Sequence, residues 1–85
     1  MIKNPADALK LMRRIESDLF EEVEDYLNVT DVQVVTRTGV IWFVQVVGDI
    51  TCHGNGYSDI IELGSESEYE ERQDEIFAAV KEWER

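Results

Sequence analysis

The run Val40–Val47, VIWFVQVV, leaves the chain few choices of fold. Extended, it presents two mostly apolar sets of side chains on opposite faces: Val40, Trp42, Val44 and Val46, and Ile41, Phe43, Gln45 and Val47. A strand of this kind lies in the middle of a sheet and needs cover on both faces. We expect one helix on each face. If both helices share one face, the other exposes Trp42 or Phe43 in a patch suited to a homodimer or a hydrophobic partner.

Amphipathic patterns on either side of this run predict two helices. The first covers residues 5–27, with Asn4 as N-cap and Pro5 at the first helical position. Its apolar stripe consists of Ala8, Met12, Ile15, Leu19, Val23 and Tyr26. The last helix covers residues 66–84 and begins at a capping box of Ser65 and Glu68. Its stripe consists of Tyr69, Gln73, Ile76, Phe77, Val80 and Trp83, and we expect Trp83 to lie in the core.

Strand patterns fill the middle of the chain. Apolar and polar residues alternate over 31–37, and the run at 40–47 follows after Thr38 and Gly39, which predicts a hairpin. Gly48 and Asp49 suit a two-residue turn into a third strand at 50–53. Residues 57–63 fit either a fourth strand or a helical turn. The 85 residues therefore predict a single α+β domain, α-β-β-β-α, with a three-stranded or four-stranded antiparallel sheet packed by two helices.

Acidic residues dominate the composition. Nineteen acids oppose eight bases, for a formal charge of −11, while an apolar content of 44% is typical of a folded domain. Such a charge repels nucleic acid and anionic membranes and attracts basic partners. The single cysteine, Cys52, and the lack of a signal-peptide pattern or a membrane-length apolar run predict a cytoplasmic protein.

Two groups of acids are the candidate partner-binding residues. The first is predicted at the C-terminal end of the first helix, where the helix dipole disfavours negative charge: Asp18, Glu21, Glu22, Glu24 and Asp25. We expect Asp18, Glu21 and Asp25 to form a solvent-facing ladder opposite the apolar stripe. The second group, on the last helix, is Glu71, Asp74 and Glu75. If the helices are antiparallel, the two groups join into one negative surface.

The inventory of reactive residues argues against an enzyme. Cys52 and His53 could form a nucleophile–base pair, but neighbouring strand residues point to opposite faces. One cysteine and one histidine cannot complete a tetrahedral zinc site, and the segment HGNGY lacks the remaining features of a phosphate-binding loop. We therefore expect no catalytic residues, no metal and no cofactor.

These observations predict a non-enzymatic acidic interaction protein. Its partner would be a basic protein surface, most concretely the groove of a nucleic-acid-binding protein, which the carboxylates would occupy in place of phosphates. In size, charge and compactness the chain is similar to small phage and mobile-element inhibitors that mimic DNA, including anti-CRISPR and anti-restriction proteins. No motif accompanies that similarity, so it implies no binding residues. The alternatives are an acidic immunity protein or chaperone that masks a basic toxin or effector, and an accessory subunit without mimicry.

Overall fold

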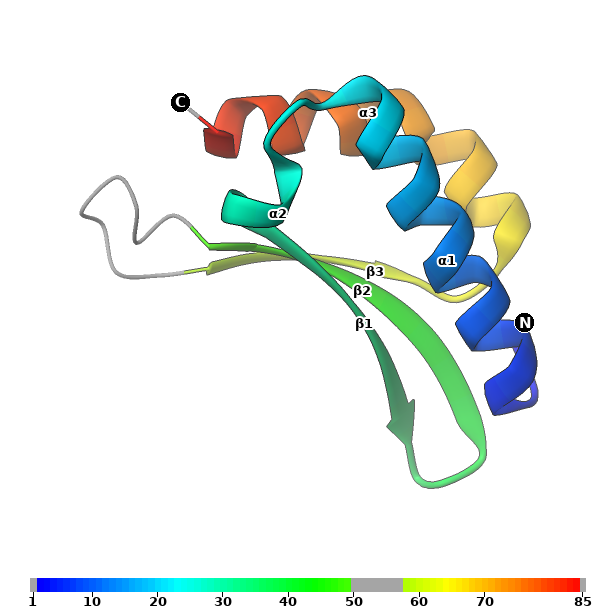
Figure 1. Ribbon diagram of the computed structural model, residues 1–85. Helices are drawn as coiled ribbons and strands as arrows, with labels where there is room; N and C mark the ends of the chain where they lie inside the picture. The colour runs from blue at the N-terminus through cyan, green and yellow to red at the C-terminus, as the bar shows by residue number, and fades with distance from the viewer. Residues whose placement is uncertain (1, 50–57, 85) are drawn as a thin grey trace.

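The computed structural model describes residues 2–49 and 58–84 and confirms the predicted α+β fold class. Its elements are α1 (Pro5–Glu22), the single-turn α2 (Tyr26–Val29), β1 (Thr30–Arg37), β2 (Ile41–Asp49), β3 (Ser58–Leu63) and α3 (Glu66–Glu84). The three strands form one antiparallel sheet in the order β1-β2-β3, so β2, which contains most of the apolar run, is the central strand (Figure 1).

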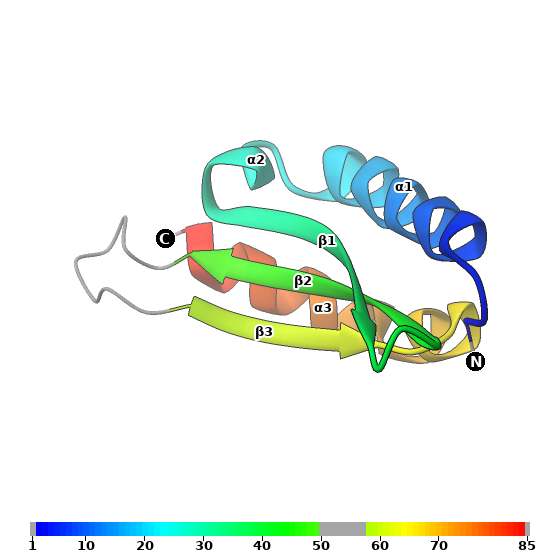
Figure 2. The same ribbon diagram turned by 90° about the horizontal axis from the view of Figure 1, so that it is seen from below.

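Both long helices pack on the same face of the sheet, so the expected helix on each face is wrong (Figures 1 and 2). Side chains of Trp42, Val44 and Val46 point to this helix face and pack in or against the core. The helices contribute these buried core residues: Ala8, Leu11, Ile15, Leu19, Tyr69, Ile76, Val80 and Trp83. Trp83 therefore lies in the core, as predicted.

The strands differ from the prediction beyond residue 47. Gly48 and Asp49 do not form a turn, because β2 continues through them and pairs them with Asp59 and Ser58 of β3. Residues 58–63, for which strand and helical turn were both open, form a strand. The strand predicted at 50–53, together with Cys52 and His53, lies outside the described residues.

The turn between β1 and β2 lies where the sequence indicates it. Thr38 and Gly39 have φ angles of 59° and 73°, and the Val40 N–H donates to the Arg37 carbonyl across them. Two successive residues with positive φ are characteristic of a type I′ turn, whose twist matches that of the flanking strands. In the register that follows, Arg37 pairs with Ile41 and Val34 with Val44, so Val40 is an additional residue between the turn and β2.

The first helix ends earlier than predicted. α1 stops at Glu22, where Val23 is extended and its N–H donates to the Leu19 carbonyl. The last turn of α1 contains acids and no base, a combination that the helix dipole disfavours. Glu24 and Asp25 therefore lie in the connection to α2, and Glu21 and Asp25 are not neighbours on one helix. The predicted helical ladder is not formed.

The two long helices run in the same direction. Both views show α1 and α3 starting at the same end of the sheet and pointing toward the other (Figures 1 and 2). Ile2 ties these starts together, because its N–H donates to the Gly64 carbonyl just before α3 and its carbonyl accepts from Trp42. In the described part of the chain, no helix combines the length and the apolar content needed to cross a membrane.

Gly48 provides a test of the packing between β2 and α3. A Cβ atom at this position would overlap the carbon atoms of the Trp83 ring, which packs directly on the glycine. We expect Gly48→Ala to displace the ring and to lower the free energy of unfolding by about 1 to 3 kcal/mol, measured by urea denaturation.

Gly64→Ala is the matched control, because its Cβ would meet nothing closer than a Glu68 carboxylate oxygen at 3.5 Å. We expect it to change stability by less than about 1 kcal/mol. Equal stability of the two alanine variants would contradict the described position of Trp83.

Candidate partner-binding surface

Asp18 lies between the helices, although the sequence places it opposite the apolar stripe. Its Oδ2 accepts hydrogen bonds from the Tyr69 hydroxyl at 2.6 Å and from the Gln73 amide at 3.3 Å, both on α3. The Gln73 amide also donates to the Tyr69 hydroxyl at 3.2 Å. Because Asp18 is committed to these contacts, it joins α1 to α3 and is not a free ligand for a partner.

Arg14, one turn before Asp18, neutralises the beginning of α3. Its guanidinium pairs with the carboxylates of Glu66 and Glu70 and lies 5.3 Å from the centre of the Tyr69 ring. Hydrogen bonds to Glu70 and Glu66 raise the pKa of Arg14 above its ordinary value, so the side chain stays charged. At the other end of the contact, Lys81 of α3 lies 4.0 Å from Glu22 of α1.

This pairing pattern follows from the parallel helices and changes the predicted charge distribution. The single negative surface required antiparallel helices, which would have placed the acidic end of α1 beside the acidic beginning of α3. Instead, the acidic beginning of α3 lies beside Arg14, and Glu22 lies beside Lys81. Part of the acidic charge is therefore neutralised within the fold.

Glu75 is also engaged. Arg72 donates to both of its carboxylate oxygens at 3.1 Å, and these hydrogen bonds lower the pKa of Glu75 below its ordinary value. Arg72 also donates to the Glu62 carbonyl of β3, 3.2 Å away. Arg72 thus holds α3 against the edge of the sheet, and this local pairing makes Glu75 a weaker candidate for partner binding.

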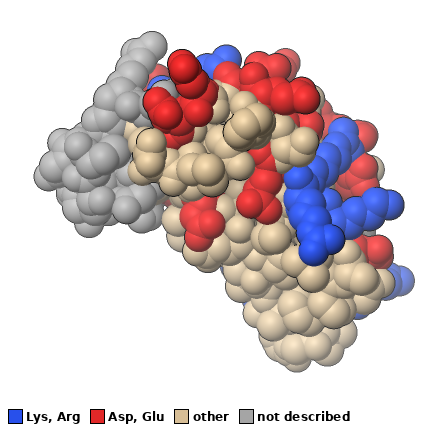
Figure 3. Space-filling model, in the orientation of Figure 1, with Lys and Arg blue, Asp and Glu red and all other residues tan. Residues whose placement is uncertain are grey.

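Five of the predicted partner-binding residues remain exposed and form no ion pair within the described residues. They are Glu21, Glu24, Asp25, Glu71 and Asp74, and we call them the acid surface. Glu21, Glu24 and Asp25 mark the end of α1 and its connection to α2, while Glu71 and Asp74 lie on α3. Figure 3 shows acidic side chains gathered over the helix layer and basic ones over the right-hand side of the molecule. Glu82, which the sequence pattern does not distinguish, is also exposed on α3 and has no ion pair among the described residues.

The open face of the sheet does not expose the predicted aromatic patch. Trp42 points to the helix face, and Phe43, which points to the open face, is only 6% exposed. The Arg37 guanidinium covers the Phe43 ring at 4.7 Å and is held there by Glu62 at 2.7 Å. Ile41 and Ile60 are the large apolar side chains that this face does expose. Among residues 2–49 and 58–84, this face therefore presents no exposed aromatic side chain to the homodimer predicted through the sheet.

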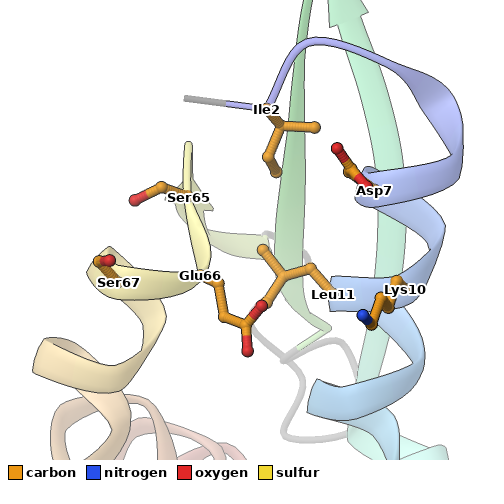
Figure 4. Close-up of a pocket in the computed structure, with 7 residues that line it drawn as sticks. All are labelled: Ile2, Asp7, Lys10, Leu11, Ser65, Glu66 and Ser67. Carbon is orange, nitrogen blue, oxygen red and sulfur yellow. The ribbon is translucent and has the colours of Figure 1, made fainter.

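A cavity of about 390 Å³ lies where α1 and α3 begin. Asp7, Lys10 and Glu66 surround it with both signs of charge, and Ser65 and Ser67 complete its polar side (Figure 4). The first-turn amides of both helices are already capped, since Asn4 accepts from Asp7 and Ser65 accepts from Glu68. The carboxylates of Asp7 and Glu66 oppose the binding of an anion there.

The described residues contain no group of three or more histidine, cysteine or acidic side chains placed to hold a metal. Comparison of the chain with protein-family models, curated proteins and solved structures found no match. The function must therefore be inferred from the charges and contacts themselves.

Tyr69→Phe tests the contact between the helices. Burial, together with the hydrogen bond to Asp18, raises the pKa of Tyr69 from 10.0 to about 12. The stability that the hydroxyl contributes is therefore complete below pH 10 and is lost as the pH rises toward 12. At neutral pH we expect Tyr69→Phe to reduce the free energy of unfolding by about 1.5 to 3 kcal/mol. The wild type should lose this advantage in urea denaturation near pH 12.

Tyr26→Phe is the control, because burial also raises the pKa of Tyr26 but no hydrogen bond from its hydroxyl to a described residue is present. At neutral pH, Tyr26→Phe should lower the free energy of unfolding by less than Tyr69→Phe does. A difference between wild type and Tyr69→Phe that stays constant from neutral pH to pH 12 would contradict the Tyr69–Asp18 hydrogen bond.

Proposed function

We propose that the chain is a non-enzymatic acidic interaction protein that presents the acid surface to the basic groove of a nucleic-acid-binding protein and thereby inhibits it. The proposal rests on one observation: the carboxylates of the acid surface form no ion pair with a lysine or arginine among the described residues. Arg14, Arg72 and Lys81 are already occupied by other acids. The acid surface therefore keeps its negative charge facing solvent in two groups, one at the end of α1 and in its connection to α2, and one in the first half of α3.

The spacing of these carboxylates supports a partner that normally binds a phosphate backbone. Glu71 and Asp74 are three residues apart on α3, so their Cβ atoms lie about 5 to 6 Å apart. One strand of DNA carries a phosphate about every 3.4 Å of helix axis. The two scales are similar enough for lysine and arginine side chains of a nucleic-acid groove to reach successive carboxylates.

Retention of proteins from a cell lysate tests the proposal. The immobilised chain should retain nucleic-acid-binding proteins, and either salt or excess duplex DNA should release them, because both compete for the same cations. Retained proteins that neither treatment releases would contradict a role for the acid surface. Retention of a basic protein that binds no nucleic acid would favour the masking of a toxin or effector instead.

Neutralising the acid surface should weaken binding of the retained partner. The amide is the closest uncharged replacement for each acid, so the variant is Glu71→Gln with Asp74→Asn. We expect it to raise Kd by about tenfold, measured by isothermal titration calorimetry at low salt, because steering and pairing are both lost.

Asp7→Asn with Asp31→Asn is the matched control, since it removes the same charge from two exposed residues outside the acid surface. It should change Kd by less than about threefold. Equal effects of the two double variants would show that only net charge matters and would remove Glu71 and Asp74 from the interface.

A further inference from the structure

One side of α1 faces away from α3 and forms no ion pair or side-chain hydrogen bond with another described element. Arg14 and Asp18 mark the side that faces α3. At about 100° per residue, the opposite side carries Leu9, Arg13, Glu16 and Phe20, at spacings of four, three and four residues. We call these four residues the outer stripe. Figure 2 shows that α1 lies along the β1 side of the sheet, where β1 is an edge strand.

Three residues of the outer stripe, Leu9, Arg13 and Phe20, are exposed, and Glu16 is half-buried. Leu9 is 39% exposed and Phe20 is 70% exposed. Arg13 and Glu16 are near enough in sequence to pair, yet they form no ion pair with each other or with another described residue. Glu16 instead lies near Tyr26, whose pKa its charge helps to raise after the larger effect of burial. An aromatic ring, an aliphatic side chain and two opposite charges are therefore available on one face.

We propose that two copies of the chain pair through the outer stripe, with their α1 helices antiparallel. The stripe is complementary to itself. A two-fold axis that passes between residues 14 and 15 places Leu9 opposite Phe20 of the second copy and Arg13 opposite its Glu16. Both matches occur twice, as an isologous interface requires. The aromatic ring then packs on an aliphatic side chain, and each charge meets its opposite.

The charge distribution selects this face over the rest of the surface. Two copies with a formal charge of −11 each repel one another, so an interface needs a face whose own charges balance. The outer stripe has one cation and one anion. The acid surface would carry only like charges into such a contact, and the Asp18 side of α1 is occupied by α3. Pairing through the outer stripe leaves the acid surface accessible on both copies.

Pairing also accounts for the unprotected edge of the sheet. β1 is an eight-residue edge strand with no proline or lysine and an unbroken register against β2. Exposed edges of this kind invite other strands unless something covers them. By contrast, Arg72 binds the Glu62 carbonyl on β3, the other edge strand. A second copy placed along α1 lies over the β1 edge and covers it.

Charge reversal gives the sharpest test. Arg13→Glu places a carboxylate opposite Glu16 of the second copy at two places, and Glu16→Arg places two guanidinium groups together at the same two places. Each single variant should raise the dimer dissociation constant by about tenfold or more. The double variant R13E/E16R restores opposite charges and should return the constant to near the wild-type value. Sedimentation equilibrium between about 10 µM and 1 mM covers the affinities of a small interface.

The buffer should contain about 0.15 M NaCl, at which the Debye length is about 8 Å, so that repulsion between distant acids of the two copies is reduced while charges in direct contact still interact. Lys10→Glu controls for net charge, because Lys10 lies on α1 outside the outer stripe and lines the cavity beside α3. Phe20→Ala should weaken the dimer about tenfold. Leu27→Ala should not, although Leu27 is 71% exposed, because it lies on α2.

Circular dichroism melts establish that each variant is folded. A wild type that stays monomeric throughout the concentration range would overturn the proposal. So would a dimer that withstands Arg13→Glu, or a double variant that is no better than the single ones. Because these measurements use the chain alone, they succeed or fail independently of binding to a basic partner.

Discussion

In the sequence, three antiparallel strands lie between the two long helices. Because this number is odd, it determines which charged residues of α1 lie beside which charged residues of α3. Each helix runs back along the strand next to it in sequence, so α1 is antiparallel to β1 and α3 is antiparallel to β3 (Figure 2). Because β1 and β3 point the same way, α1 and α3 are parallel. A fourth strand in the sheet would have reversed α3. It would then have placed the acidic beginning of α3 beside the acidic end of α1.

The parallel arrangement stabilises the fold and limits what its surface can bind. The Tyr69–Asp18 hydrogen bond is short and partly buried, and bonds to a charged group contribute about 1.5 to 3 kcal/mol. The ion pairs of Arg14 and Lys81 are more exposed, so each contributes at most about 1 kcal/mol. The hydrogen bond is therefore the stronger link between the helices. The ion pairs matter more for the proposed function, because they neutralise specific acids that a basic partner could otherwise bind.

The fold class and the last helix were predictable from the sequence, because they depend on periodicity and capping. α3 matches its predicted range, and the hairpin lies at Thr38–Gly39. The position of Gly48 was not predictable, because its role is to let the Trp83 ring approach β2, a contact between residues distant in sequence. Glycine and aspartate in succession are typical of a turn, and only the tertiary contact overrides that pattern.

The candidate site was only partly predictable, for a geometric reason. The apolar stripe assigned to α1 included Met12, whereas the structure buries Leu11 and leaves Met12 half-buried. This difference rotates the buried face toward Asp18 and brings that residue to α3. It also leaves Phe20 exposed on the other side. Periodicity identifies that a helix has a buried face, but the neighbouring helix decides the exact orientation of that face.

The relative direction of α1 and α3 is the claim on which the charge distribution depends, and nuclear Overhauser contacts test it most directly. The parallel arrangement predicts cross-peaks from the Tyr69 ring to the side chains of Arg14 and Asp18, and from Lys81 to Glu22. Cross-peaks between Glu22 and the first turn of α3, without those from Tyr69 to Asp18, would contradict it.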